Sequence, residues 1–202
     1  DYFDSNFNYS ITLNKLNQNW QPSSGYKSSF RQTLPIHSDD FSVVNSFQYS
    51  KYYSPNENSI FSFKFLAETV NSLTGEDVRI SKRLYLPSKR LKGFEFGKIG
   101  PKDGADYVGG NYTTAVNFTT TLPGLLSNLE NIDFSLFFDA GNVWGVDYSD
   151  TLDENSKIRS STGLSVDWLT PIGPLSFSFS KPITKASTDK TETFRFDIGT
   201  TF

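Results

Sequence analysis

Few residues in this sequence could carry out chemistry. The 202-residue chain contains no cysteine, and its one histidine, His37, lies beside Ser38-Asp39-Asp40 in a predicted turn, as a solvated loop residue would. Cysteine nucleophiles, disulfides and thiolate zinc sites are therefore excluded, and a lone histidine lacks the companions that a metal site needs. The chain has no glycine-rich phosphate loop between a strand and a helix, and no Ser/His/Asp set can be built on His37. We expect a non-enzymatic protein with no cofactor and no bound metal.

The most unusual charged segment is a long connection from about residue 71 to residue 110. It contains the run Arg90-Leu91-Lys92-Gly93-Phe94, followed by Ile99-Gly100-Pro101. A connection of roughly 40 residues without a strand pattern far exceeds the usual ~4–6 residues, so it is functional, disordered, or a sign of a wrong strand assignment. We interpret it as functional.

The composition argues against a nucleic-acid partner and does not exclude a membrane protein. A net charge of −3 and a sequence pI of about 5.2 argue against a nucleic-acid-binding surface. Methionine is absent, so we expect the chain to be part of a processed or longer protein. No apolar run reaches the ~20 residues of a membrane-spanning helix. The mean hydropathy of −0.42 does not exclude a membrane barrel, because alternating strands hide their apolar face from an average.

Alternation of apolar and polar residues predicts nine β-strands. In the first strand Phe7, Tyr9, Ile11 and Leu13 are apolar, whereas the residues between them are polar. Strands of about 9–13 residues are long enough to cross a bilayer at the usual tilt. The predicted strands cover about residues 7–14, 25–36, 41–53, 61–68, 111–122, 132–139, 158–168, 175–180 and 194–202.

The connections between these strands alternate in length. On the side of Phe202 the sequence places turns at 18–24, 54–59, 123–130 and 169–172. On the opposite side it places 37–40, 70–110, 145–157 and 182–192, three of which are long. Short periplasmic turns and long extracellular loops are typical of outer-membrane barrels. Trp20, Trp144 and Trp168 stand at strand ends, where aromatic girdles lie.

A soluble β-sandwich is the alternative to a membrane barrel, because its strands alternate too. Two features favour the barrel. The apolar positions are unusually aromatic, with 16% Phe, Trp and Tyr in the chain. The polar positions carry lysine, arginine and aspartate, which a hydrated lumen can hold and a narrow closed core cannot.

Several motifs resemble the BamA family of outer-membrane β-barrel insertases. Leu91-Lys92-Gly93-Phe94 resembles the family's V/I-R-G-F/Y loop signature, and Phe137-Phe138-Asp139-Ala140-Gly141 resembles its F-x-D-x-G strand motif. The similarity covers nearly the whole chain. Further matches are Ile99-Gly100-Pro101, Gly109-Gly110-Asn111, Pro171-Ile172-Gly173-Pro174-Leu175 and the closing strand at 194–202 with its C-terminal aromatic residue.

The resemblance implies an all-β fold, an antiparallel transmembrane β-barrel in the bacterial outer membrane. Residues 1–202 would form the C-terminal nine or so strands of a sixteen-stranded barrel, preceded by POTRA domains, with an extracellular loop at about 71–110 folded into the lumen. Such a fragment should not function alone, because its two unpaired edges are prohibited in hydrocarbon.

The implied function is insertion of β-barrel proteins through a lateral seam between the first and last strands. The implied partners are unfolded outer-membrane protein clients, assembly-machine lipoproteins and the lipid bilayer. The alternatives are a TamA-type assembly factor or a two-partner secretion transporter, which share the loop motif, and a passive porin or surface antigen.

The resemblance also implies a site. The loop motif Leu91, Lys92, Gly93 and Phe94 would meet lumen-facing partners on the barrel wall. Lys92 stands where the family has arginine, and Thr119 stands where it has glutamate, so an ammonium suited to one carboxylate would replace a guanidinium that serves two. Arg90 is the alternative source of the cation, and a merely solvated Lys92 is a third reading. The implied lumen partners are Phe137, Asp139, Gly141 and Thr119.

The last strand is the implied pairing edge. Alternation places Phe196, Ile198 and Phe202 toward lipid. It places Arg195, Asp197 and Gly199 inward, and Gly199 lacks a side chain to support the ladder.

Overall fold

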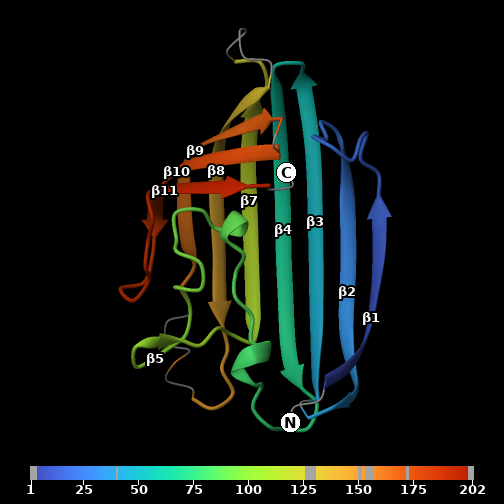
Figure 1. The fold of residues 1–202 in the computed structure, drawn as a ribbon, viewed down its shortest axis with the longest axis vertical. Helices are drawn as coiled ribbons and strands as arrows, with labels where there is room; N and C mark the ends of the chain where they lie inside the picture. Colours follow the sequence, from blue (N-terminus) through green and yellow to red (C-terminus); the bar gives the residue numbers. More distant parts are fainter. Residues whose placement is uncertain are drawn as a thin grey trace.

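The computed structural model describes residues 4–39, 41–125, 131–149, 152, 157–171 and 173–199. Nine strands form one antiparallel sheet in chain order, β1-β2-β3-β4-β7-β8-β9-β10-β11 (Figure 1). Their bounds are β1 Asp4–Asn14, β2 Gly25–Ser38, β3 Ser42–Asn56, β4 Ser59–Ser72, β7 Tyr112–Leu122, β8 Ile132–Trp144, β9 Arg159–Thr170, β10 Gly173–Thr184 and β11 Phe194–Ile198.

All nine predicted strands are present. The largest differences are at strand ends, where β4 continues to Ser72, β8 to Trp144 and β10 to Thr184. These extensions contain glycine, asparagine or proline, which weaken the alternation signal but are held by neighbouring strands. The end of the predicted closing strand, with Phe202, lies outside the described residues, as does Ile172 of the preceding turn.

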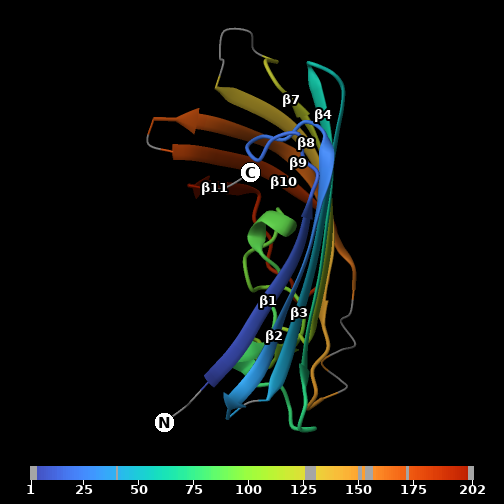
Figure 2. The same ribbon diagram turned by 90° about the vertical axis from the view of Figure 1, so that its right-hand side faces the viewer.

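The two faces of the sheet differ in polarity, as the period of two predicts. Large apolar side chains stand exposed on the outer face, including Ile11, Phe118, Leu136 and Ile198. Figure 2 shows that the sheet is strongly curved and that the long connection lies on its concave side. The polar inner face of the strands is thus the surface against which the connection packs.

The long connection is structured rather than irregular. It contains two short 3-10 helices, η1 (Ile80–Lys82) and η2 (Ser88–Arg90), and a small ribbon of β5 (Lys102–Asp103) with β6 (Asp106–Tyr107). None of the helices in the described part of the chain has the length and apolar character needed to cross a membrane.

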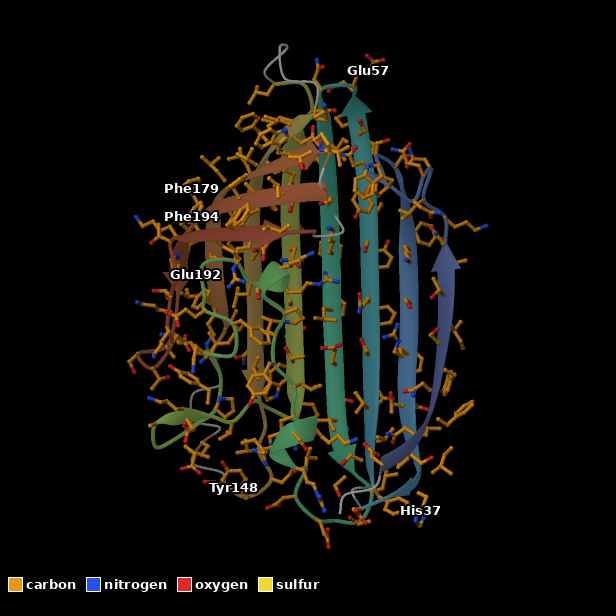
Figure 3. All side chains as sticks on the ribbon, viewed as in Figure 1. His37, Glu57, Tyr148, Phe179, Glu192 and Phe194 are labelled. Carbon is orange, nitrogen blue, oxygen red and sulfur yellow. The ribbon has the colours of Figure 1, made fainter. Side chains whose placement is uncertain are left out.

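The connections gather at two ends of the sheet, in the grouping that the sequence predicts. Glu57, in the turn between β3 and β4, lies at one end, and His37 and Tyr148 lie at the other (Figure 3). The two outer strands are edges within the described residues: β1 pairs with β2 alone, and β11 pairs with β10 alone.

Candidate functional site

The long connection is attached to the inner face by a small apolar cluster. Four of its side chains, Leu86, Leu91, Phe94 and Ile99, are almost fully buried. They pack with the inward-facing residues Leu66 of β4, Ala115 of β7 and Val143 of β8. This cluster explains the apolar residues that interrupt the polar face of the sheet. It holds the loop motif over β4, β7 and β8.

Lys92 forms an ion pair with Asp139 of β8. The Lys92 Nζ lies 2.8 Å from the Asp139 Oδ2, and the Asp139 side chain is completely buried whereas that of Lys92 is 18% exposed. The Lys92 backbone N–H also donates to the same oxygen, at 3.1 Å. The carboxylate therefore fixes both the charge and the backbone of the loop motif.

Asn117 of β7 completes the environment of Asp139. Its Nδ2 donates to the Asp139 Oδ1 at 2.7 Å and to the Arg90 carbonyl at 2.9 Å. On the other side, the Ser161 hydroxyl of β9 donates to the Lys92 carbonyl. A buried carboxylate is stabilised when donors satisfy its lone pairs. Three strands thus hold one short segment of the connection.

Phe137 and two glycines shape the floor of the site. The Lys92 Nζ lies 4.0 Å from the centre of the Phe137 ring, which is a cation–π geometry. Gly163 of β9 leaves space for this ring and for the adjacent strand, because a Cβ there would lie 2.8 Å from the Phe137 Cζ and closer still to the Phe179 carbonyl oxygen. At Gly141 a Cβ would lie 2.8 Å from the Leu86 Cδ2. The strand motif therefore supplies the Phe137 ring under the Lys92 ammonium, the Asp139 carboxylate that pairs with it, and the space at Gly141 for the Leu86 side chain.

Gly93 lets the loop motif turn against the sheet. Its φ is +91°, a conformation that side-chain-bearing residues rarely adopt. A Cβ at this position would also lie 3.1 Å from the Ser180 Cβ and 3.3 Å from the Ser161 Cβ.

Arg90 does not take the place of Lys92. Its guanidinium donates to the side-chain oxygens of Gln48, at 3.3 Å, and Asn117, at 3.4 Å. Burial lowers the pKa of Arg90, and the charge of Glu68 on β4 acts in the opposite direction. Among the described residues, Asp139 forms its ion pair with Lys92, and Arg90 forms no ion pair.

Thr119 lines the same inner-face cavity as Lys92, but the β7 residue that contacts Asp139 is Asn117. Thr119 is directly opposite Phe137 in the β7–β8 register, whereas Asn117 is opposite Asp139. No hydrogen bond joins Thr119 to Lys92 in the part of the chain that the structure describes. Both residues face inward, so alternation alone could not separate them, and the register of the two strands decides.

Sequence reasoning also missed a second buried ion pair, between Arg159 at the start of β9 and Asp189 in the β10–β11 connection. Arg159 Nε and Nη2 each donate to one Asp189 oxygen at 3.0 Å, and both side chains are completely buried. The Asp189 carboxylate also accepts the Ala186 N–H at 2.6 Å. Alternation with Ile158 and Leu164 places Arg159 inward, but its partner Asp189 lies in a connection without periodicity.

The β10–β11 connection pairs with the loop motif through its backbone. Phe94 and Thr191 form an isolated β-bridge, and the Glu192 N–H donates to the Gly93 carbonyl at 3.1 Å. On β11 the Arg195 Nη2 donates to the Phe94 carbonyl at 3.4 Å. The loop motif therefore contacts the edge strand directly.

The implied closing-strand residues lie as alternation predicts where they are described. Phe196 and Ile198 are exposed on the outer face, and the Phe196 ring stacks on Phe177 of β10 with centroids 4.9 Å apart. The Gly199 N–H still pairs, donating to the Pro174 carbonyl at 2.8 Å.

A partly buried loop cation paired with the aspartate of an F-x-D-x-G strand is accompanied by a match to a known family. The Omp85 superfamily domain matches residues 1–202. The chain belongs to the Omp85 superfamily. Family members of this BamA type are outer-membrane proteins of bacteria, and this chain is placed in that membrane with them.

Individual members of the Omp85 superfamily show the same relationship. The outer membrane protein assembly factor BamA of Neisseria meningitidis serogroup B is 29% identical over 197 residues, covering 75% of this chain. BamA of Neorickettsia risticii is 26% identical over 199 residues, covering 96% of this chain. The chain spans 24% and 27% of the lengths of these two relatives.

A solved structure has the same fold. The crystal structure of BamA from Haemophilus ducreyi lacking POTRA domains 1–3 superposes with a TM-score of 0.85 at 27% identity. The match covers 95% of this chain and 41% of the BamA chain. The nine-stranded sheet is therefore similar to a portion of a BamA barrel.

Proposed function

We propose that this chain forms the C-terminal part of the barrel wall of an outer-membrane insertase, which folds and inserts β-barrel proteins through a lateral seam. Membership of the Omp85 superfamily supports the assembly role, and the BamA relatives carry that role in their names. We place the seam at β11, the last strand of the sheet in chain order, which pairs with β10 on one side and would meet the first barrel strand on the other.

The proposed mechanism is β-augmentation. An edge strand presents unpaired N–H and C=O groups that capture an incoming strand through main-chain hydrogen bonds. In hydrocarbon those groups are costly to leave unpaired, so a client strand that satisfies them is favoured. The step breaks no covalent bond, and we propose that the protein acts without enzymatic catalysis, with unfolded barrel precursors as clients and assembly lipoproteins as partners.

The loop motif has a positioning role in this proposal. Lys92 and Asp139 fix the connection to the wall, and the same connection holds the start of β11 through the Phe94 carbonyl and Arg195. We propose that this contact keeps one end of the edge strand registered while the rest of the edge exchanges partners.

The experiment is a seam lock in the full-length protein. Paired cysteines between β11 and the first strand of the barrel should crosslink, and the oxidised protein should assemble client barrels much more slowly than the reduced protein. A matched control places the cysteine pair between β10 and β11 at Ser176 and Asp197, which are paired in register. That internal lock should leave assembly unchanged, whereas a locked seam that assembles clients at the normal rate would refute the seam.

A further inference from the structure

The outer face of the nine-stranded sheet is almost free of charge. Within the described residues, alternation places two charged side chains on it: Lys51 of β3 and Lys181 of β10. Lys51 is exposed and makes no hydrogen bond or ion pair with the described part of the chain. Charged side chains are disfavoured at positions that face lipid, so an unpaired cation there requires an explanation.

Lys51 stands beside a hollow in the outer face. The hollow has a volume of about 420 Å³ and is lined by Lys51 and by residues of β3, β4, β7 and β8 that are mostly apolar, with Ser62, Thr119 and Thr120 among them. The lining aromatic residues are Tyr53, Phe61, Phe63, Phe118, Phe137 and Phe138, of which Phe137 belongs to the inner face of the sheet.

The strand register explains why the face is hollowed at this place. One row across the sheet runs from Lys51 through Phe63 and Phe118 to Phe138. The adjacent row runs from Tyr53 through Phe61 and Thr120 to Leu136. Thr120 is the one small side chain in these two rows, and the large side chains around it leave a gap above its hydroxyl and methyl groups.

We infer that this hollow binds one anionic glycerophospholipid, with an acyl chain over Thr120 and the phosphate at the Lys51 ammonium. An acyl chain in an aromatic-lined gap gains closer van der Waals contacts than it has among loosely packed lipids. The Lys51 ammonium is a point charge suited to a phosphate. The inference requires the membrane location and is independent of the seam.

The position of Lys51 along β3 fits a headgroup contact. β3 ends at Asn56, and its turn, marked by Glu57, lies at one end of the sheet (Figure 3). A lysine near that end can extend its four-carbon stem along apolar surface and place the ammonium at the membrane boundary. Its register partner Tyr26 on β2 contributes a second amphipathic side chain at the same level.

The test is native mass spectrometry of the full-length protein released from nanodiscs of phosphatidylcholine that contain phosphatidylglycerol. The parent protein should retain one phosphatidylglycerol, and Lys51→Gln should reduce its retention about five-fold. Thr120→Trp keeps the cation but fills the hollow, so it should reduce retention by a similar factor. Lys181→Gln is the matched control, because it removes the other outer-face cation, which does not line the hollow. It should retain the lipid.

Heat-modifiable migration on gels identifies folded variants, and Thr120→Leu replaces Thr120→Trp if the larger residue prevents folding. Unchanged retention in Lys51→Gln would overturn the inference. An equal loss in Lys181→Gln would also overturn it, since general charge attraction would then suffice. Full retention in the folded hollow-filling variant would show that the hollow holds no chain.

Discussion

At the scale of residues, Asp139 is the centre of the candidate site. It accepts hydrogen bonds from Asn117 and from the Lys92 backbone, and it pairs with the Lys92 ammonium at 2.8 Å. Removing either partner would leave a buried group unsatisfied, which is the costly half of the hydrogen-bond balance. The exposed fraction of Lys92, 18%, moderates that cost, because water can reach one side of the ammonium.

A double-mutant cycle measures this contact. Lys92→Ala and Asp139→Ala should each lower the free energy of unfolding by about 1–3 kcal/mol. The double variant should lose less than the sum, with a coupling of about 0.5–3 kcal/mol. Urea unfolding followed by tryptophan fluorescence supplies the values. Strictly additive losses would contradict a direct contact, and a larger loss in Arg90→Ala than in Lys92→Ala would move the role to Arg90.

A second carboxylate tests why Asn117 stands opposite Asp139. Asn117→Glu should destabilise the protein, because it removes a donor and places a like charge beside a buried carboxylate. Adding Lys92→Arg should restore most of the stability, since a guanidinium fork can serve two carboxylates. Thr119→Glu is the control, and it should gain no comparable benefit from Lys92→Arg. Rescue at Thr119 instead of Asn117 would contradict the observed register.

At the scale of elements, the connections are tied to one another as well as to the sheet. Arg159 and Asp189 join the start of β9 to the β10–β11 connection, and the bridge between Phe94 and Thr191 joins that connection to the loop motif. The long loop, β9 and the last hairpin therefore form one hydrogen-bonded unit on the inner face. A substitution in one part of this unit should therefore change the stability of the backbone hydrogen bonds at the edge strand β11.

Hydrogen exchange can test this coupling. Arg159→Ala leaves a buried carboxylate unpaired, and the loss of one partner of a buried pair costs roughly 3–5 kcal/mol. Amide exchange should accelerate at residues 93–98 and 190–198, whereas β1 to β3 should be unaffected. Lys82→Ala is the control, because its ion pair with Asp4 is partly exposed. Unchanged exchange at 93–98 in Arg159→Ala would separate the loop motif from the last hairpin.

The elements and the site differ in how far the sequence predicts them. The strands were predictable because apolar and polar residues alternate along them, as Phe61, Phe63 and Phe65 alternate with polar or inward-facing residues in β4. The contact of Lys92 with Asp139 followed from the resemblance of two motifs. The contact of Asn117 with Asp139 depends on the register between β7 and β8, which a period of two does not specify. The contact of Asp189 with Arg159 depends on how the β10–β11 connection folds, which the alternation does not specify either.

At the scale of the whole molecule, the described chain is an open, curved sheet with two edges. A lipid-facing sheet edge is unstable, so the edges must be paired in the membrane, by other strands of the barrel or by a client. The similar BamA chain is longer than this one, and the match covers 41% of it. Under the proposed function, β11 pairs either with the first barrel strand or with a client strand.

The orientation of the barrel can be tested by labelling. Single cysteines at Ser149 and Ser187 lie in connections of the end that carries the long loop, and Asn56 lies at the opposite end. An impermeant maleimide should label the first two on intact cells and should label Asn56→Cys only after the outer membrane is breached. The reverse pattern would place the long connection in the periplasm and overturn the proposed direction.

The most direct measurement of the central claim is capture of a client strand by β11. A photoreactive phenylalanine analogue at Phe196 of the full-length protein should crosslink to the strands of a stalled barrel precursor. The same analogue at Leu136, an exposed outer-face residue of β8, provides the control because β8 is paired on both sides. The account predicts client crosslinks at position 196 that exceed those at position 136 and disappear when the precursor is released. Equal crosslinking at both positions, or none at position 196 during active assembly, would contradict it.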